Sequence, residues 1–279
     1  MKIIAIVNGK ARNKKLVLDD LERITNHDLD VLVTKKAQDT IDFTHDAIGK
    51  SPDLLIICGG DGTANRVVNS LMDYEVAKRP TLAIFPSGSA NDFSRSLKHE
   101  SIEKTIFRFE QGNKIPVDLS LIQTLQGSVY SLNMATMGLG ANVARTVNKR
   151  KGRTPAAFKF FSSTIGWVLA YKPAKIQIQI GDVTIKMRPY MAAFGNGKFV
   201  GYGLGICPQA VLGDGNFAVT LISKIGIFDY ARYISTIRQA KEIKNDLRVI
   251  YHTAKFAEIK VLERKLGIET DGEFFQTLQ

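Results

Sequence analysis

Short apolar runs alternate with amphipathic stretches in the first part of the chain. Four runs, at residues 3–7, 31–34, 54–57 and 82–85, are predominantly apolar, and the stretches near 14–26, 38–49 and 64–73 repeat their apolar positions with helical spacing. Runs of this kind predict strands that are buried on both faces. Strands joined by helices form a mostly parallel sheet with right-handed crossovers, so the pattern predicts an α/β domain.

The pattern becomes predominantly β-type from about residue 114. Predicted strands lie at residues 117–124, 129–137, 175–180, 183–187, 190–195, 217–222 and 256–262, with helical patterns near 140–171 and 226–240. The Gly181-Asp182 pair between two of these runs is typical of a hairpin turn. We therefore expect a second, antiparallel β-sandwich domain, with the two domains at residues 1–115 and 116–279.

The composition is that of a soluble globular protein, with 44% hydrophobic and 23% charged residues. A chain of 279 residues is long enough for two cores. No run reaches the ~18 uninterrupted apolar residues of a spanning helix. Residues 1–7 lack the basic region and cleavage site of a secretory leader, so they are predicted to form a strand. Two cysteines, Cys58 and Cys207, are too few for a disulfide framework and indicate a reducing cytoplasm.

The net charge of +11 favours polyanionic partners. Nucleotides, anionic membranes and nucleic acid all fit this charge, as does a generally solvated basic surface. The hypothesis of nucleic-acid binding has no support besides the charge, so it ranks last. The basic residues 149–153 precede an aromatic-rich helical segment that contains Phe158, Phe160, Phe161 and Trp167. This combination predicts peripheral binding to an anionic membrane, and packing in the core is the alternative explanation for the aromatic residues.

A glycine-rich loop follows the predicted strand at residues 54–57. Its sequence is Gly59-Gly60-Asp61-Gly62-Thr63, and a predicted helix begins directly after it. Glycines let backbone amides approach a polyphosphate closely, and the amino end of a helix favours anions. The Asp61 carboxylate can organise hydrated Mg²⁺. No Gly-Lys-Ser/Thr ends this loop, so it differs from a Walker P-loop.

Two further segments carry candidate chemistry. Residues 86–93 again follow a strand with a tight turn, in which Ser89 can donate to a phosphate or an adenosine hydroxyl. Two such loops at the carboxyl edge of one sheet favour ligand binding over simple connections. Near the end of the chain, Asp271 and Glu273 flank a glycine, so one carboxylate can face a substrate hydroxyl while the other orients it or faces Mg²⁺. A solvated acidic turn is the alternative for this segment.

These three segments together resemble the diacylglycerol kinase catalytic-domain family, which includes bacterial soluble diacylglycerol kinases, ceramide kinases and sphingosine kinases. The resemblance rests on Gly-Gly-Asp-Gly-Thr at 59–63, Pro-Ser-Gly-Ser-Ala-Asn-Asp-Phe at 86–93 and Asp-Gly-Glu at 271–273, in this order. It implies an N-terminal NAD-kinase-like α/β domain, a C-terminal β-sandwich and an active site in the cleft between them. The three segments in this order span nearly the whole chain. Together they are specific for the family, whereas no single segment would be.

The resemblance also implies roles for individual residues. The expected nucleotide contacts are Asn8, Gly9, Lys10, Ala11, Arg12, Thr34, Gly59, Gly60, Asp61, Gly62, Thr63, Ala64, Asn65 and Ser89. Glu273 matches the family's proton acceptor, with Asp271 as the second candidate. A Mg²⁺ site is implied at the Asp214 carboxylate and the main-chain carbonyls of Val211 and Asn216, an oxygen-only set that suits this ion. An exposed Asp-Gly turn is the alternative for Asp214.

The expected function is an ATP- and Mg²⁺-dependent kinase that phosphorylates a lipid hydroxyl, for example converting diacylglycerol into phosphatidic acid, from the cytoplasmic side of a membrane. Asp61 would position Mg²⁺ through water, and Glu273, assisted by Asp271, would remove the proton from the attacking hydroxyl. A kinase for a soluble acceptor and a nucleotide-binding regulator at the membrane are the alternatives. The family often has Asn-Pro where this chain has Asn8-Gly9, which predicts altered contacts on the adenine side. The chain also ends soon after Glu273, which predicts an altered activity or lipid choice. The lipid and a homodimeric state stay open.

Overall fold

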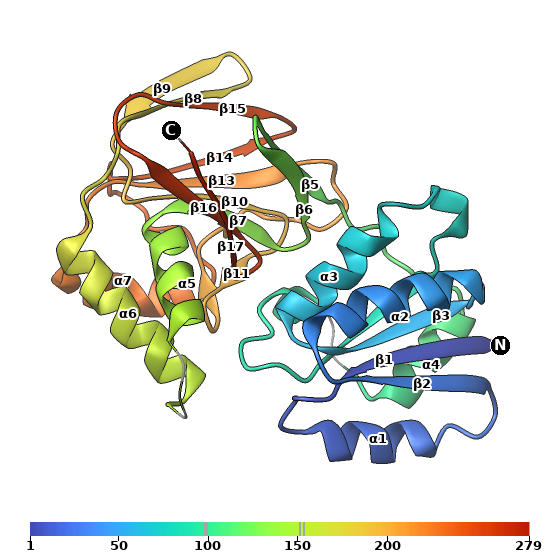
Figure 1. Ribbon diagram of the computed structural model, residues 1–279. Coiled ribbons are helices and arrows are strands. Elements are labelled where there is room, and N and C mark those ends of the chain that lie inside the picture. The colour runs from blue at the N-terminus through green and yellow to red at the C-terminus, as the bar shows by residue number, and fades with distance from the viewer. Residues whose placement is uncertain (98–99, 151, 153, 279) are drawn as a thin grey trace. The chain divides into compact units, whose positions relative to one another are not determined.

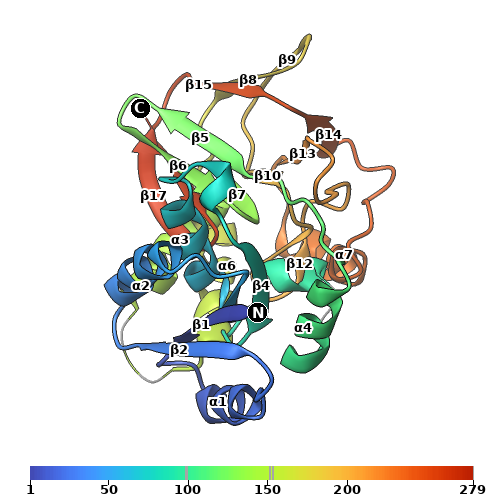
Figure 2. The ribbon, with the colours of Figure 1, turned by 90° about the vertical axis from the view of Figure 1, so that its right-hand side faces the viewer.

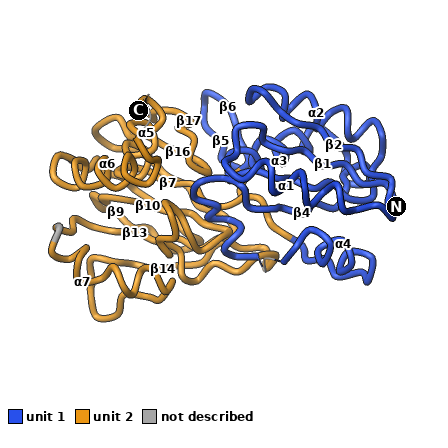
Figure 3. The backbone as a smooth tube through the Cα atoms, turned by 90° about the horizontal axis from the view of Figure 1, so that it is seen from below, with its two compact units in different colours: residues 1–116, 121–130 blue, residues 117–120, 131–279 orange. Residues whose placement is uncertain are grey.

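The computed structural model describes residues 1–97, 100–150, 152 and 154–278, and it divides the chain into two compact units. The first unit comprises residues 1–116 and 121–130, and the second comprises residues 117–120 and 131–279 (Figure 3). The first is an α/β unit around a parallel sheet, and the second is built on antiparallel sheets. This confirms the predicted fold class.

The first unit contains a four-stranded parallel sheet in the order β2-β1-β3-β4. The strands are β1 (Lys2–Asn8), β2 (Asp28–Thr34), β3 (Leu54–Gly59) and β4 (Thr81–Pro86). The central strand β3 is buried along its whole length, as its uninterrupted apolar sequence predicts.

Helices cover both faces of this sheet (Figures 1 and 2). They are α1 (Lys14–Glu22), α2 (Ala37–Gly49), α3 (Asp61–Leu71) and α4 (Ile102–Glu110). Val17 and Leu21 of α1 and Ile102 and Ile106 of α4 share one core with alternate residues of β1 and β3. Helices α2 and α3 pack side by side on the opposite face. The sequence pattern anticipated α1 to α3 but not α4.

The second unit contains a six-stranded sheet in the order β14-β13-β10-β7-β16-β17, in which every pairing is antiparallel. These strands are β7 (Met134–Gly138), β10 (Met191–Gly195), β13 (Phe217–Ile222), β14 (Val249–Ala254), β16 (Leu266–Thr270) and β17 (Glu273–Leu278). Of these, β14, β16 and β17 were not anticipated.

Three smaller sheets contain the other described strands. A three-stranded sheet contains β15 (Ala257–Val261), β8 (Ile176–Ile180) and β9 (Val183–Met187), and its β8–β9 turn is the predicted Gly181-Asp182 turn. The two pairs are β5 (Ser120–Thr124) with β6 (Gly127–Ser131), and β11 (Phe199–Val200) with β12 (Leu204–Gly205).

Helices α5 (Leu139–Lys149), α6 (Ala156–Ala170) and α7 (Ile227–Arg238) belong to the second unit, where α5 packs against α6 (Figure 1) and α7 packs against β12. No helix in the described part of the chain has both the length and the apolar character that crossing a membrane requires.

Candidate active site

The four parallel strands of the first unit place most of the predicted nucleotide residues along one edge. They end at Asn8, Thr34, Gly59 and Pro86, and the strand register pairs Asn8 with Thr34 and Gly59 with Pro86. Carboxyl ends of parallel strands are where α/β sheets bind their ligands. The structure therefore brings the first loop, the glycine loop and the Ser89 loop together, as the sequence predicted.

The first of these loops is held tightly against the next strand. The Gly9 N–H donates to the Thr34 carbonyl at 3.1 Å, and a Cβ added at Gly9 would lie 2.0 Å from that same oxygen. Only glycine allows this approach. The following residues Lys10, Ala11 and Arg12 lie between β1 and α1, and both basic side chains are exposed. Nucleotide contact by this segment stays a prediction.

Gly60 and Gly88 bring the glycine loop and the Ser89 loop into backbone contact. A Cβ built on Gly88 would lie 2.4 Å from the Gly60 Cα, and one built on Gly60 would lie 3.0 Å from the Gly88 Cα. Asn91, at a φ of 53°, holds the second loop by accepting a bond from the Gly88 N–H and donating one to the Gly88 carbonyl. The two glycines thus serve loop-to-loop packing, a reason that the sequence did not disclose.

The Asp61 carboxylate fastens the same two loops together. Its Oδ2 accepts the Asp92 N–H and its Oδ1 accepts the Phe93 N–H, both at 3.0 Å. These amides begin the short helix η2 (Phe93–Ser96), whose first N–H groups have no acceptor within the helix. Asp61 therefore has a structural role at this edge, and its proposed action on Mg²⁺ stays a prediction.

The remaining predicted residues of this edge differ in accessibility. Thr63 and Ala64 are buried in the first turn of α3, whereas Ser89 is exposed at the tip of its loop. Asn65 is buried, and its Nδ2 donates to the Tyr130 carbonyl at 3.1 Å. Ser87, which the sequence analysis did not single out, is buried with no hydrogen-bond partner for its Oγ among the described residues.

In the second unit, the predicted acidic segment forms the turn of the β16–β17 hairpin. Asp271 and Gly272 are its two central residues, with φ angles of 51° and 85°. Two positive φ angles are the requirement of a type I′ turn, for which Asp-Gly is a favoured pair. The turn is closed by the Thr270–Glu273 pairing, so Glu273 is the first residue of β17.

Asp271 is buried, although it lies in a turn. Its carboxylate accepts four hydrogen bonds, from the Ser131 hydroxyl at 3.2 Å and from the main-chain N–H groups of Leu132, Asn133 and Met134 at 2.8, 2.9 and 2.9 Å. These donors precede or begin β7. The side chain therefore anchors the turn, and it is poorly placed to serve as an exposed base.

Glu269 is a second buried carboxylate, which sequence reasoning did not identify as functional. It accepts the Thr136 hydroxyl at 2.6 Å and the Gly272 N–H at 2.9 Å, so it holds the turn from the end of β16, two residues before Asp271. Burial raises the pKa of Glu269 to about 7, the two hydrogen bonds oppose this shift, and the charges of Asp271 and Glu273 add to it.

Glu273 is the exposed carboxylate of this hairpin. Helix α5 supports the turn beside it, since Asn148 Nδ2 donates to the Gly272 carbonyl at 3.2 Å and the Arg145 guanidinium lies 5.1 Å from the centre of the Phe274 ring. The hairpin therefore presents one exposed acid on a turn that two buried acids hold in place.

Both units match known families. Residues 2–122 match the family described as "Diacylglycerol kinase catalytic domain", and residues 133–278 match the one described as "YegS C-terminal NAD kinase beta sandwich-like domain". The chain belongs to the family of the second description, and its first unit is a diacylglycerol kinase catalytic domain. This confirms the resemblance drawn from the three sequence segments, and it makes the protein a lipid kinase; a kinase implies the use of ATP.

Individual relatives agree with this membership. A protein of Yersinia pestis (strain Pestoides F) named "Probable lipid kinase YegS-like" is 27% identical over 273 residues, which cover 97% of this chain and 89% of the relative. One of the same name from Cronobacter sakazakii is 26% identical over 213 residues, covering 75% and 70%. A "putative diacylglycerol kinase from Bacillus anthracis str. Sterne" has a crystal structure that is similar with a TM-score of 0.74 and 26% identity, over 99% of this chain and 91% of that one.

The predicted metal loop of the lipid kinase lies between β12 and β13. Asp214 Oδ1 accepts the Asn216 N–H at 2.9 Å, and the neighbouring Gly215 N–H donates to Asp118 Oδ2 at 2.8 Å. Two carboxylates thus bond to adjacent amides of one turn, and oxygen donors of this kind fit a hard cation such as Mg²⁺. Among the described residues, no group of three or more His, Cys, Asp or Glu side chains could hold a metal ion, so any site here depends on main-chain carbonyls.

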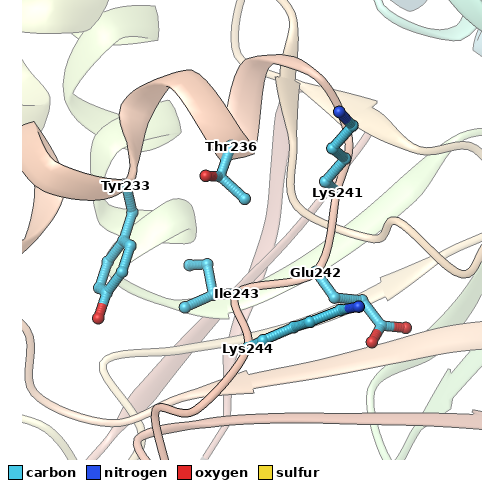
Figure 4. Close-up of a pocket in the computed structure, with 6 residues that line it drawn as sticks. All are labelled: Tyr233, Thr236, Lys241, Glu242, Ile243 and Lys244. Atoms are coloured by element: carbon cyan, nitrogen blue, oxygen red, sulfur yellow. The ribbon is translucent and has the colours of Figure 1, made fainter.

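A cavity in the second unit contains none of the predicted site residues. It has a volume of about 610 Å³ and is formed by α7 and the segment after it (Figure 4). Its lining residues are Tyr233, Thr236, Lys241, Glu242, Ile243 and Lys244. Its two lysines and its glutamate are exposed, and we assign this cavity no role in catalysis.

Proposed function

We propose that this lipid kinase transfers the γ-phosphoryl group of ATP to the hydroxyl group of a membrane lipid such as diacylglycerol, which would give phosphatidic acid. The observation that carries the proposal is the pair of preorganised elements: a set of glycine-bearing loops at one strand edge, and an exposed Glu273 on a turn that two buried carboxylates anchor. Family membership supports the lipid kinase class, and the hydroxyl acceptor and its identity are the proposed part.

The first unit would bind Mg²⁺-ATP as its substrate. The main-chain amides at Gly60 to Gly62 lie at the amino end of α3, where the helix dipole favours phosphate. The exposed Lys10 and Arg12 beside the same edge add positive charge, and the exposed Ser89 hydroxyl can donate to the nucleotide. Each oxygen of Asp61 already accepts one main-chain N–H of the next loop. Asp61 would therefore act on the metal through water with its remaining lone pairs.

The chemical step would be an in-line displacement. The acceptor oxygen forms a bond to the γ-phosphorus, the bond between that phosphorus and the bridging oxygen of ADP breaks, and the hydroxyl proton passes to the Glu273 carboxylate. An alcohol is a poor nucleophile until an acceptor takes its proton, and positioning and charge neutralisation provide most of the remaining rate gain.

Asp271 and Glu269 would serve as positioning residues for this base. Together they fix both sides of the turn through six hydrogen bonds, four to Asp271 and two to Glu269. A catalytic group must be held near its productive geometry, and a misplacement of about 1 Å costs about 10²-fold in rate. Of the two bases that the sequence left open, the structure thus favours Glu273.

The loop from residue 211 to residue 216 would hold a second Mg²⁺ through the Asp214 carboxylate and the carbonyls of Val211 and Asn216. A cation there would neutralise the neighbouring carboxylates Asp118 and Asp214 and stiffen the turn, whose two glycines, Gly213 and Gly215, have φ angles of 74°. We assign this ion a structural contribution.

A soluble acceptor is the second candidate, because the family description of residues 133–278 refers to an NAD kinase-like sandwich. Incubation of the full chain with γ-labelled ATP and Mg²⁺, with diacylglycerol, ceramide, sphingosine and monoacylglycerol in mixed micelles and with NAD in solution, separates the two. Label in a lipid product supports the proposal. Label in NADP alone would overturn it, and label in no product with retained ATP binding would indicate a regulator.

A further inference from the structure

Helix α6 carries an exposed apolar stripe along one side. Phe158, Ile165 and Leu169 are 64%, 48% and 73% exposed, and their spacing of seven and four residues places them on one helix face. Three large apolar side chains in a row on a surface helix form a patch, unlike single exposed residues, and a patch of this kind indicates an interaction site.

The opposite face of α6 explains why the stripe is not part of the core. The Phe160 ring packs at a tilt against Tyr202 and lies beside Gly201, Trp167 Nε1 donates to the Thr146 hydroxyl at 2.8 Å, and Ser163 is buried. Helix α5 packs alongside (Figure 1). The sequence analysis attributed these aromatic residues either to core or to membrane; Phe160 and Trp167 belong to the packed face, and Phe158 belongs to the exposed one.

The charges on the sequence segment that carries the stripe are of one sign. The chain has no aspartate or glutamate from residue 119 to residue 181, and the same segment contains eight lysines and arginines. Lys149 and Arg150 precede α6 and Lys172 follows it, all exposed, so cations lie at both ends of the helix. Lys151 and Arg153 of the predicted basic cluster lie outside the described residues.

We propose that the Phe158–Ile165–Leu169 stripe docks on the surface of an anionic lipid bilayer, with Lys149 and Lys172 against the headgroups. This rests on the proposed function, since a kinase for a lipid hydroxyl must meet its substrate at a membrane. The charge decides against a second copy of the chain as the occupant, because two such helices would bring like charges together without an acid between residues 119 and 181. An apolar stripe flanked by cations is the pattern of helices that lie in the membrane interface.

Vesicle binding in the absence of nucleotide and acceptor tests the surface separately from catalysis. The wild type should co-sediment with phosphatidylcholine vesicles that contain phosphatidylglycerol and much less with phosphatidylcholine alone. The double variant Ile165→Gln/Leu169→Gln should weaken this binding by about tenfold or more, since each aliphatic side chain leaves the apolar phase. Lys149→Ala and Lys172→Ala should each weaken it about fivefold at low salt. The matched control Leu125→Gln/Leu247→Gln changes two exposed leucines elsewhere and should bind as the wild type does.

A fluorophore on Leu169→Cys shows whether the stripe itself enters the bilayer. The native Cys58 and Cys207 are buried, and burial raises the pKa of both thiols to about 12, so an environment-sensitive dye labels the introduced thiol selectively. We expect a blue shift on adding anionic vesicles for Leu169→Cys and none for Leu247→Cys.

Three outcomes would overturn the docking surface: binding unaffected by the Ile165/Leu169 change, equal shifts at both labelled positions, or a concentration-dependent shift without vesicles, which would indicate that a second copy covers the stripe. Docking through α6 by a protein that phosphorylates no lipid would overturn the proposed function and support the surface.

Discussion

The carboxylate of Asp271 accepts a hydrogen bond of 2.9 Å from the main-chain N–H of Met134, the first residue of β7. A side chain in one hairpin turn thereby fixes the start of a strand that lies 137 residues earlier in the chain. The same carboxylate also accepts the N–H groups of Leu132 and Asn133, so three consecutive main-chain donors point at this one side chain.

Replacing Asp271 with asparagine should destabilise the fold more than it alters the chemistry. Asparagine tolerates the positive φ of the turn, but its amide lacks the charge and the second acceptor oxygen, so buried N–H groups lose their partner. We expect the free energy of unfolding to fall by about 2–3 kcal/mol in urea titrations. The control Asp182→Asn makes the same change in the exposed β8–β9 turn and should alter stability by less than about 0.5 kcal/mol. Equal effects at the two turns would argue against the anchoring role.

Glu269 should give the stability a specific pH dependence. Its pKa is about 7 in the folded protein and 4.5 in the unfolded chain, so the folded state binds the additional proton between these values. Stability from this group is therefore complete below about pH 4.5 and is lost as pH rises through 7, by about 3 kcal/mol at most. Glutamine resembles the protonated acid, so Glu269→Gln should remove this loss. In urea titrations from pH 5 to 8, the free energy of unfolding of Glu269→Gln should rise relative to that of the wild type as the pH increases. The same pH dependence in both proteins would contradict the assignment.

Asp61 should matter for folding as well as for nucleotide binding. Asp61→Ala removes both acceptors of the Asp92 and Phe93 amides, and we expect a loss of about 1.5–3 kcal/mol of stability together with loss of ATP binding. Asp61→Asn keeps one acceptor oxygen, so its stability should lie between that of the wild type and that of Asp61→Ala. Unfolding titrations and calorimetric ATP affinity measure the two effects, with the exposed Asp73→Asn as control. Unchanged stability of the alanine variant would show that the two bonds contribute nothing.

The contact between Gly60 and Gly88 leaves no room for a methyl group on Gly88. Gly88→Ala places a Cβ 2.4 Å from the Gly60 Cα, so the two loops must separate at a cost of about 1–3 kcal/mol, and ATP affinity should fall with them. Gly49→Ala is the matched control, because no heavy atom lies within 4 Å of its Cβ position at the end of α2; it should stabilise by about 0.5–1 kcal/mol. Wild-type ATP affinity in Gly88→Ala would rule out this contact as a support of the nucleotide edge.

The spacing of apolar residues predicted the elements whose own sequence carries a clear apolar pattern. The four parallel strands are an example, and so is the β8–β9 hairpin at its Gly-Asp turn. Helix α4 was missed although Ser101 caps it by accepting the Lys104 N–H and although Ile102 and Ile106 recur with helical spacing, because its nine residues give only two turns of the pattern. Strands β16 and β17 were missed because their apolar runs are short, and their strand character depends on pairing with β7 and with each other.

The site was predictable where it depended on sequence order and not where it depended on tertiary contacts. Strand ends at one sheet edge followed from the βα alternation alone. The bond between Thr136 and Glu269 joins residues 133 positions apart, so nothing local marks Glu269 as a buried acid. The same holds for the donors around Asp271, which turn a candidate base into an anchor.

The most direct test of the account is the initial rate of phosphate transfer from γ-labelled ATP to the best lipid acceptor by the wild type and by Glu273→Gln. Glutamine preserves size and hydrogen bonding but cannot take the proton, so turnover should fall by about 10²–10⁴-fold, with ATP affinity and unfolding unchanged because the side chain is exposed. Asp271→Asn should retain more activity than Glu273→Gln at a temperature where both are folded. Full turnover in Glu273→Gln would contradict the account and place the base elsewhere.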